Sequence, residues 1–280
     1  MIIKKNIVLN RKDKKPILID TFCSENKTNH PILIFCHGYK GFKDWGAWKL
    51  MAKSIASEGF CFIKFNFSHN GGTIENPIDF PDLEAFGNNN YTTELDDLND
   101  VIDWVENHFN NSAFADINKI CLVGHSRGGG IAILKASEDS RIKKLITLAS
   151  VSDFGRRTAT VGDIEEWRDS GVKYVLNGRT KQQMPHYYQF YKDFKTNEKR
   201  LNIESAVKRL DIPMLIIHGN KDTSVSINEA KELHEWNPIS QLKTVENADH
   251  VFNTKHPWAY NNLSPELDNV KNSIVNFTSI

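Results

Sequence analysis

Ser126 lies in the pentapeptide 124–128, which reads GHSRG, between the apolar run 119–123 and the small and apolar residues 129–134. A serine with a glycine two residues to either side, between a strand and a helix, is typical of a turn that exposes a nucleophile. Small neighbours are needed because this strained turn brings the strand and helix backbones close together. Chance also produces the five-residue pattern, so its context must support the interpretation. The flanking runs fit a strand and a helix, and we predict that Ser126 is a nucleophile.

A serine nucleophile needs a base that takes its proton and a carboxylate that holds the base in the right tautomer. Asp222 follows the apolar run 213–217, and His250 follows the run 241–245. Both side chains are therefore expected on loops at the carboxyl edge of a sheet. The chain order of serine, acid and histidine matches one known arrangement of these groups. We predict a triad of Ser126, Asp222 and His250.

Each of these assignments has a competing interpretation. Asp222 could be a turn or N-cap residue for a helix near Asn228, because aspartate favours such positions. Asp153, which follows an earlier strand-like run, is the alternative acid. The histidines that compete with His250 as the base are His37, His69, His125 and His218. Chain order and loop placement together favour Asp222 and His250.

The tetrahedral intermediate of acyl transfer carries a negative oxygen, which needs two backbone donors. One donor is expected to be the N–H of Arg127, next to the nucleophile and at the positive end of a helix. The other is expected to be the N–H of Tyr39, in the HGYKG loop that follows the apolar run 31–36. An ordinary glycine turn explains this loop equally well, and its position alone favours the oxyanion hole. The side chains of His37 and His125 are expected to be structural hydrogen-bonding groups.

These groups require a sheet whose strands end along one edge. Apolar runs without strict alternation, as expected of strands covered on both faces, occur at 31–36, 61–67, 120–123, 145–149 and 213–217. Helical patterns at 45–57 and 91–109 bridge them, which predicts an α/β fold with a mostly parallel sheet and helices on both faces. The runs 2–9 and 16–22 are expected to form an antiparallel hairpin at the sheet edge.

The stretch 152–209 breaks this rhythm, since it is rich in aromatic and charged residues and contains no strand-like run. Helical spacing of the aromatic residues from 187 to 194 predicts an amphipathic helix. A segment inserted between two strands would lie over the carboxyl ends of the sheet, where a cap belongs. We therefore expect a core domain of residues 1–151 and 210–280 and a small cap of residues 152–209.

Composition excludes several classes of protein. Lys plus Arg and Asp plus Glu each number 35 in 280 residues, which argues against a nucleic-acid surface or a polybasic membrane patch. No apolar run is long enough for a signal peptide or a membrane span. The four cysteines form no paired motif and are expected to be buried free thiols: Cys23, Cys36, Cys61 and Cys121. A cytoplasmic location is expected.

The chain resembles the α/β-hydrolase superfamily in four segments: HG at 37–38, GHSRGG at 124–129, HGNKD at 218–222 and DH at 249–250. The resemblance implies the α/β-hydrolase fold with an eight-stranded sheet, the triad named above, and neither a metal nor an organic cofactor. Within the superfamily the chain is similar to bacterial esterases and serine-aminopeptidase-like hydrolases with a small cap, including feruloyl esterases. The segment 65–71, FNFSHNG, departs from the arginine-glycine-histidine-glycine sequence of many relatives, which weakens the transfer of a substrate class.

The function expected is that of a serine hydrolase, most simply a carboxylesterase that cleaves an ester of a small or medium acyl group, aromatic groups included, through an acyl-enzyme. Tyr187, Tyr191 and Trp167 are the expected aromatic lining of the substrate pocket, although packing within the cap is the commoner use of such rings. The expected partner is a small-molecule ester, with no nucleic acid and no membrane, and a homodimer is left open.

Three alternatives stay open on the same fold. A peptidase or amidase would anchor a charged substrate group, for which Arg127, Glu165 and Glu166 are candidates, while surface ion pairs are the commoner fate of such residues. An acyl-thioesterase would use the same triad. A hydrolase fold that only binds a ligand is the alternative without catalysis, and an apparently complete triad argues against it.

Overall fold

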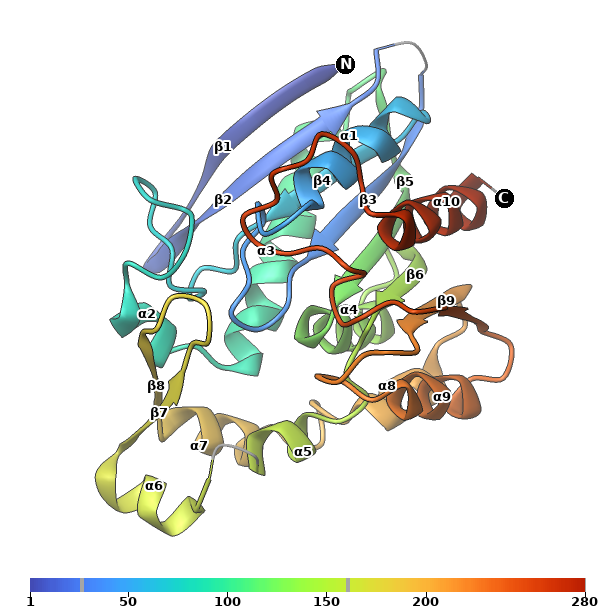
Figure 1. Cartoon of the computed structure of the whole chain (residues 1–280). Coiled ribbons are helices and arrows are strands. Elements are labelled where there is room, and N and C mark those ends of the chain that lie inside the picture. Colours follow the sequence, from blue (N-terminus) through green and yellow to red (C-terminus); the bar gives the residue numbers. More distant parts are fainter. Residues whose placement is uncertain (26–27, 160–161, 280) are drawn as a thin grey trace.

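An eight-stranded sheet runs through the centre of the computed structural model, which describes residues 1–25, 28–159 and 162–279 (Figure 1). The strand order is β1-β2-β4-β3-β5-β6-β9-β10. The strands are β1 (Ile2–Arg11), β2 (Lys14–Cys23), β3 (His30–Cys36), β4 (Cys61–Phe65), β5 (Ala115–His125), β6 (Ile142–Leu148), β9 (Met214–Gly219) and β10 (Gln241–Val245). β2 pairs antiparallel with β1 and β4, and the other pairs are parallel. The predicted mostly parallel sheet with an antiparallel hairpin at its edge is confirmed.

Helices cover both faces of this sheet (Figure 1). One face carries α1 (Trp48–Ser57) and α10 (Pro265–Ser279), and the other carries α3 (Tyr91–Phe109), α4 (Arg127–Glu138), α8 (Ile203–Arg209) and α9 (Ile227–Trp236). Because both faces are covered, the central strands are apolar without alternation. A short helix, α2 (Leu83–Gly87), precedes α3. Among the described helices, none is long and apolar enough to cross a membrane.

The insertion between β6 and β9 lies at the lower edge of the molecule in Figure 1. Before α8 it contains α5 (Phe154–Ala159), α6 (Ile164–Ser170), β7 (Val172–Leu176), β8 (Gln183–Tyr187) and α7 (Gln189–Thr196). The expectation of no strand here is wrong, because β7 and β8 form an antiparallel two-stranded sheet. The predicted amphipathic helix is confirmed as α7 for Tyr191 and Phe194, whereas Tyr187, which the predicted spacing included, is the last residue of β8.

The missed hairpin has a six-residue turn, 177–182, and not the two-residue turn that an Asn-Gly pair signals. Neither Asn177 nor Gly178 has the positive φ that the two-residue turn requires. The side-chain oxygen of Asn177 accepts hydrogen bonds from the backbone N–H groups of Arg179 and Thr180, at 3.0 and 3.3 Å. Apolar and polar residues alternate only weakly in β7, because Val175 interrupts the pattern. The hydrophobic period therefore does not predict this strand.

The cysteines differ from the sequence-based expectation. Cys23 and Cys61 lie directly opposite each other in the register of β2 and β4 and form a disulfide, so the expectation of free thiols is wrong for this pair. Their partnership depends on which strands pair, and sequence spacing does not reveal that. Cys36 and Cys121 are buried free thiols, as predicted, and burial raises the pKa of both.

Candidate active site

Ser126 lies at the sharp turn between β5 and α4. Its backbone has φ 55° and ψ −121°, a strained conformation for a residue with a side chain. The turn is held by its own N–H, which donates to the carbonyl of Leu148 at 2.9 Å. A Cβ on Gly124 would lie 2.3 Å from the Gly128 oxygen, and one on Gly128 would lie 2.4 Å from the Cys36 oxygen. The small flanking residues are therefore a steric requirement of this turn.

The structure brings together the three residues of the predicted triad. His250 Nε2 lies 3.0 Å from Ser126 Oγ, and His250 Nδ1 lies 2.7 Å from Asp222 Oδ2. Asp222 Oδ1 accepts hydrogen bonds from the backbone N–H groups of Ser224 and Val225, at 2.8 and 2.9 Å. With Nδ1–H donating to the carboxylate, Nε2 is left to accept from the serine hydroxyl. This arrangement can activate Ser126 as a nucleophile.

The Asp222 carboxylate is stabilised as an anion although its side chain is fully buried. Burial opposes its ionisation, yet hydrogen bonds from His218 and His250 hold the pKa of Asp222 well below its usual range. His218 Nε2 lies 3.2 Å from Asp222 Oδ2 and 3.0 Å from the Val225 carbonyl. A fixed negative charge at this place can stabilise an imidazolium on His250.

The competing residues take other places. Asp153, the alternative acid, pairs with Arg156 Nε at 3.3 Å. His125 Nε2 donates to the carbonyl of His250 at 2.9 Å, and His37 Nδ1 donates to the carbonyl of the next residue at 2.9 Å. Burial lowers the pKa of His125 to about 3 and that of His37 to about 4. Both side chains are therefore neutral hydrogen-bonding groups at pH 7.

The loop 37–43, between β3 and α1, packs against the serine turn. A Cβ on Gly38 would lie 2.9 Å from Ser126 Cβ, so the loop backbone approaches the nucleophile as closely as side chains allow. Arg127 begins α4 directly after Ser126. Tyr39 and Arg127 also line the same cavity as Ser126. Both expected oxyanion donors thus belong to segments beside the nucleophile.

The segment 65–71, which departs from the sequence of many relatives, holds this loop in place. Asn66 Oδ1 accepts a hydrogen bond from the N–H of Lys43 at 2.7 Å. The Phe67 N–H donates to His37 Nε2 at 3.2 Å, and Asn70 Nδ2 donates to a loop carbonyl, that of Gly41, at 3.2 Å. A supporting role for this segment was not evident from the sequence, because the contacts join residues far apart in the chain.

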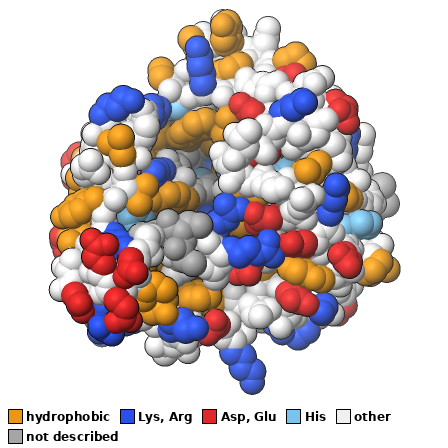
Figure 2. Space-filling model, turned by 60° about the horizontal axis from the view of Figure 1, so that its bottom comes forward, with side chains coloured by type: hydrophobic (Ala, Val, Ile, Leu, Met, Phe, Trp, Pro, Cys, Tyr) orange, Lys and Arg blue, Asp and Glu red, His pale blue; other side chains and the backbone are white. Residues whose placement is uncertain are grey.

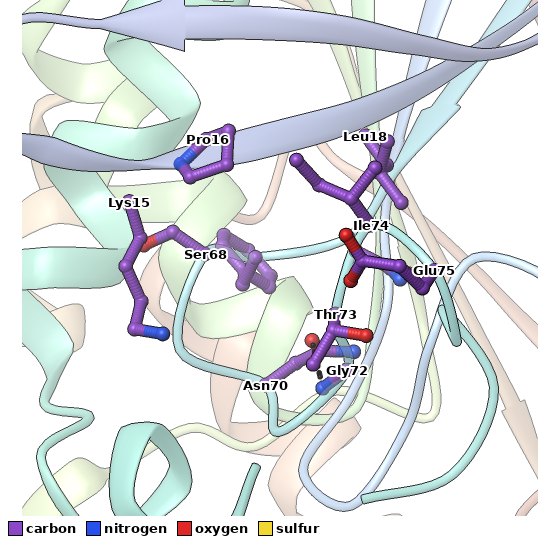
Figure 3. Close-up of a pocket in the computed structure, with 11 residues that line it drawn as sticks. Lys15, Pro16, Leu18, Ser68, Asn70, Gly72, Thr73, Ile74 and Glu75 are labelled. Carbon is purple, nitrogen blue, oxygen red and sulfur yellow. Dashed lines mark hydrogen bonds between the residues drawn. The ribbon is translucent and has the colours of Figure 1, made fainter. Parts of the chain in front are cut away.

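A small second cavity of about 200 Å³ lies between β2 and the segment that follows β4 (Figure 3). Ser68, Asn70 and Glu75 are among the side chains drawn around it. Two of its polar side chains have protein partners: Ser68 Oγ donates to Asp97 at 3.0 Å, and Lys15 Nζ pairs with Asp82 at 2.6 Å. None of the triad residues lines it. Among the described residues, no cluster of three or more His, Cys, Asp or Glu side chains is arranged to hold a metal ion.

The larger cavity beside the triad has a volume of about 360 Å³. Figure 2 turns the face that carries the insertion toward the reader, and hydrophobic side chains gather around a hollow in it. The core residues around the cavity are Tyr39, Tyr91, Ser126, Arg127, Val151, Ser224, Val225 and His250. The insertion contributes Phe154, Arg157, Val175, His186 and Phe190. The core and the insertion therefore both contribute side chains to the lining of this cavity.

The cavity is not lined by Tyr187, Tyr191 or Trp167, which corrects the sequence-based expectation. The Tyr187 hydroxyl donates to Glu84 at the surface. Trp167 is fully buried, and its Nε1 donates to the backbone carbonyl of His186 at 2.7 Å. Tyr191 lies half-buried against Trp167, with ring centroids 6.2 Å apart. Helical spacing shows which rings pack together but not toward which side of the insertion they point.

His186 is a cavity residue that the sequence did not single out. The Tyr39 hydroxyl donates to His186 Nε2 at 2.8 Å, while His186 Nδ1 donates to the carbonyl of Met184 at 3.2 Å. Burial lowers the pKa of His186 to about 4, so its ring is neutral at pH 7. This hydrogen bond connects β8 of the insertion to the loop 37–43 of the core. No motif marks it, because a lone histidine in a short strand has no distinctive spacing.

A model of the BD-FAE family matches residues 19–237. The chain belongs to the BD-FAE family. The matched stretch includes Ser126 and Asp222, and His250 lies beyond its end.

Known proteins of similar sequence or structure support the fold of this BD-FAE protein. A curated Mycoplasma pneumoniae protein named "Putative esterase/lipase 2" is 25% identical over 263 residues, which cover 85% of this chain and 89% of that protein. Est1E from Butyrivibrio proteoclasticus has a TM-score of 0.71 at 16% identity, covering 99% of this chain and 98% of its own. The α/β-hydrolase GrgF from Penicillium sp. sh18 has a TM-score of 0.67 at 15% identity, covering 100% and 98%. The predicted α/β-hydrolase fold is confirmed.

Proposed function

We propose that this protein is a serine carboxylesterase that cleaves esters of small or medium acyl groups through an acyl-enzyme. One observation supports it most: Ser126 Oγ, His250 and Asp222 are joined by hydrogen-bonding distances of 3.0 and 2.7 Å at the wall of a cavity. A serine hydroxyl is a weak nucleophile by itself, and a hydrogen-bonded, correctly oriented base is what activates it.

In the first half-reaction, Ser126 Oγ attacks the carbonyl carbon of the ester while His250 Nε2 takes the hydroxyl proton. The negative oxygen of the tetrahedral intermediate is bound by the N–H groups of Tyr39 and Arg127. The bond between the carbonyl carbon and the alcohol oxygen then breaks, and His250 gives its proton to the leaving alcohol. Asp222 stabilises the imidazolium throughout.

The second half-reaction returns the enzyme to its starting state. A water molecule attacks the acyl carbon while His250 Nε2 takes one of its protons. The bond between that carbon and Ser126 Oγ breaks, and His250 returns the proton to the serine. The carboxylic acid leaves with the oxygen of the water, so no other reactant is required.

We also propose that residues 152–209 act as a cap over a core of residues 1–151 and 210–280. The supporting observation is that this insertion has its own two-stranded sheet and supplies one side of the cavity. A solved structure of the neighbour Est1E holds ferulic acid. The rings of Tyr91, Phe154 and Phe190 line the cavity here, so we propose that aromatic acyl groups are among those accepted.

The peptidase alternative receives less support. Glu165 and Glu166, its candidate anchors in the insertion, have side chains that are 69% and 79% exposed. They pair with Arg168 and Lys173 and do not line the cavity. An ester requires no such anchor for an ammonium group.

The test is turnover of p-nitrophenyl esters of graded acyl length and of methyl ferulate by the wild type and by Ser126→Ala. We expect Ser126→Ala to lose about three orders of magnitude or more in kcat, because only binding and the oxyanion hole remain. Ser140→Ala, an exposed serine on the turn before β6, is the matched control and should retain full activity. Ester turnover that survives Ser126→Ala, or failure of a serine-directed phosphonate to label the wild type, would refute the proposal.

A further inference from the structure

The Arg127 side chain is held inside the cavity wall, next to the proposed nucleophile. It is 13% exposed, and its Nη1 lies 3.4 Å from Oε1 of Glu94, whose side chain is 5% exposed. Aromatic rings surround the guanidinium: its carbon lies 4.3 Å from the ring centroid of Tyr39, 5.3 Å from that of Tyr91 and 5.4 Å from that of Phe190. Rings that cover the guanidinium in this way fix its orientation while leaving N–H groups at its edge.

Most hydrogen-bond donors of this guanidinium have no acceptor in the protein. A guanidinium has five N–H donors. In the part of the chain that the structure describes, Glu94 is the one acceptor for the Arg127 side chain, and the bond uses Nη1. The N–H groups of Nε and Nη2 have no protein acceptor among the described residues, and Arg127 lines the cavity. The unbonded nitrogens keep some solvent exposure, so an anionic acceptor on the substrate would take the place of water there and form charge-assisted hydrogen bonds.

The charges around the cavity favour an anionic acceptor. The described residues that line the cavity include two arginines, Arg127 and Arg157, and no Asp or Glu. Arg157 is paired with Glu229. Glu94 does not line the cavity, and its one hydrogen bond with Arg127 is long, at 3.4 Å, so it competes weakly with a substrate carboxylate. Arginine is suited to such a site because its planar fork binds both oxygens of a carboxylate.

We propose that the Arg127 side chain binds a carboxylate on the acyl part of the substrate, so that the enzyme prefers half-esters of short dicarboxylic acids to uncharged esters of the same length. The inference rests on the proposed function, since it assigns a substrate class to the same site. Arg127 then has two separate tasks: its backbone N–H faces the oxyanion, and its side chain recognises the far end of the acyl chain.

The experiment compares kcat/KM for monoethyl succinate and monoethyl glutarate with that for ethyl levulinate and ethyl pentanoate. Ethyl levulinate has nearly the shape of the succinate half-ester and a neutral carbonyl in place of the carboxylate. We expect the wild type to prefer a half-ester to ethyl levulinate by about tenfold or more, the range of a charge-assisted hydrogen bond. Arg127→Gln should abolish this preference, mainly through KM, and Arg127→Lys should keep part of it because lysine retains the charge without the fork.

Glu94→Gln provides an independent test in the opposite direction. It removes the negative charge that shares Arg127, and glutamine can still accept from Asn89, which donates to Glu94 Oε1 at 2.7 Å. The preference for half-esters should therefore increase about threefold, the effect of removing a modest competing charge interaction. This variant decides the question even if Arg127→Gln does not fold.

The possible results separate the two proposals. Equal effects of Arg127→Gln on charged and uncharged esters, no preference in the wild type, or an unchanged or smaller preference in Glu94→Gln would each overturn the role of Arg127. If uncharged esters are hydrolysed in those cases, the proposed esterase function stands. If no ester of either kind is hydrolysed and the phosphonate does not label Ser126, both proposals are wrong.

Discussion

The triad and the insertion are built in different ways. Ser126, Asp222 and His250 lie on loops that follow β5, β9 and β10, which belong to the parallel part of one sheet. The insertion instead rests on its own two-stranded sheet and on packed aromatic rings around Trp167. The sheet places reactive groups through short loops at strand ends, whereas side-chain packing decides which groups of the insertion face the cavity.

Polar contacts join these two regions. The Tyr39 hydroxyl donates to His186 at 2.8 Å, and the Thr92 hydroxyl donates to Asp193 at 2.6 Å. The first contact reaches the loop expected to bind the oxyanion, and the second reaches the start of α3. Removing either contact therefore tests how strongly the insertion influences the core, while the triad residues themselves are unchanged.

The largest expected effect separates the two aspartates that competed for the role of the acid. Asp222→Asn should lower kcat about 10³- to 10⁴-fold, because an amide neither holds the required histidine tautomer nor stabilises the imidazolium. Asp153→Asn is the matched control in the insertion, and we expect it to change kcat less than about twofold. The measurement is steady-state ester hydrolysis by both variants. Similar losses of kcat in the two variants would contradict the assignment of Asp222 as the acid of the triad.

The next prediction uses acid to probe the contact between the regions. Burial lowers the pKa of His186 from its ordinary 6.5 to about 4, so the folded protein keeps this ring neutral where the unfolded chain protonates it. Stability is therefore lost as the pH falls from about 6.5 toward 4, and His186 accounts for about 2 kcal/mol of that loss at pH 5. The free energy of unfolding can be measured with denaturant at pH 7 and at pH 5. The difference between the two values should be smaller in His186→Gln than in the wild type by about that amount. An unchanged difference would show that His186 is protonated in the folded state.

Trp167 tests whether the insertion is held by packing. Trp167→Phe removes the hydrogen bond from Nε1 to the His186 carbonyl and leaves a gap among buried rings. We expect the free energy of unfolding to fall by about 1–3 kcal/mol, with kcat/KM changed less than about threefold. Thermal or denaturant unfolding together with ester kinetics measures both. A large kinetic loss without a loss of stability would place Trp167 against the substrate after all.

The sequence predicted that Ser126, Asp222 and His250 lie together, for a physical reason. A nucleophile turn requires small residues at Gly124 and Gly128, and parallel strands end at one edge, so Asp222 and His250 could be placed from the runs that precede them. The lining of the cavity could not be predicted in the same way. Tyr187 and Phe190 are both aromatic and three residues apart, yet one faces the surface and the other faces the cavity.

Contacts between segments that are distant in the chain could not be predicted from the sequence either. The disulfide between Cys23 and Cys61 depends on β2 lying beside β4, and the support of the loop 37–43 by Asn66 depends on the same sheet order. The hairpin of the insertion was missed for a local reason, because its six-residue turn does not match the two-residue Asn-Gly pattern and its strands alternate weakly.

The smallest expected effect compares two tyrosines that the sequence assigned to different regions. Tyr39→Phe keeps the backbone N–H beside Ser126 but removes the hydroxyl that donates to His186, so a buried ring nitrogen loses its partner. We expect KM for uncharged esters to rise about two- to tenfold with little change in kcat, since a neutral hydrogen bond is worth about 0.5–1.5 kcal/mol. Tyr187→Phe removes an equivalent hydroxyl that pairs with Glu84 outside the cavity, and it should leave both constants unchanged. Steady-state kinetics of the pair then measures how strongly the insertion constrains the oxyanion loop, because any effect shared by both variants cannot arise from the cavity.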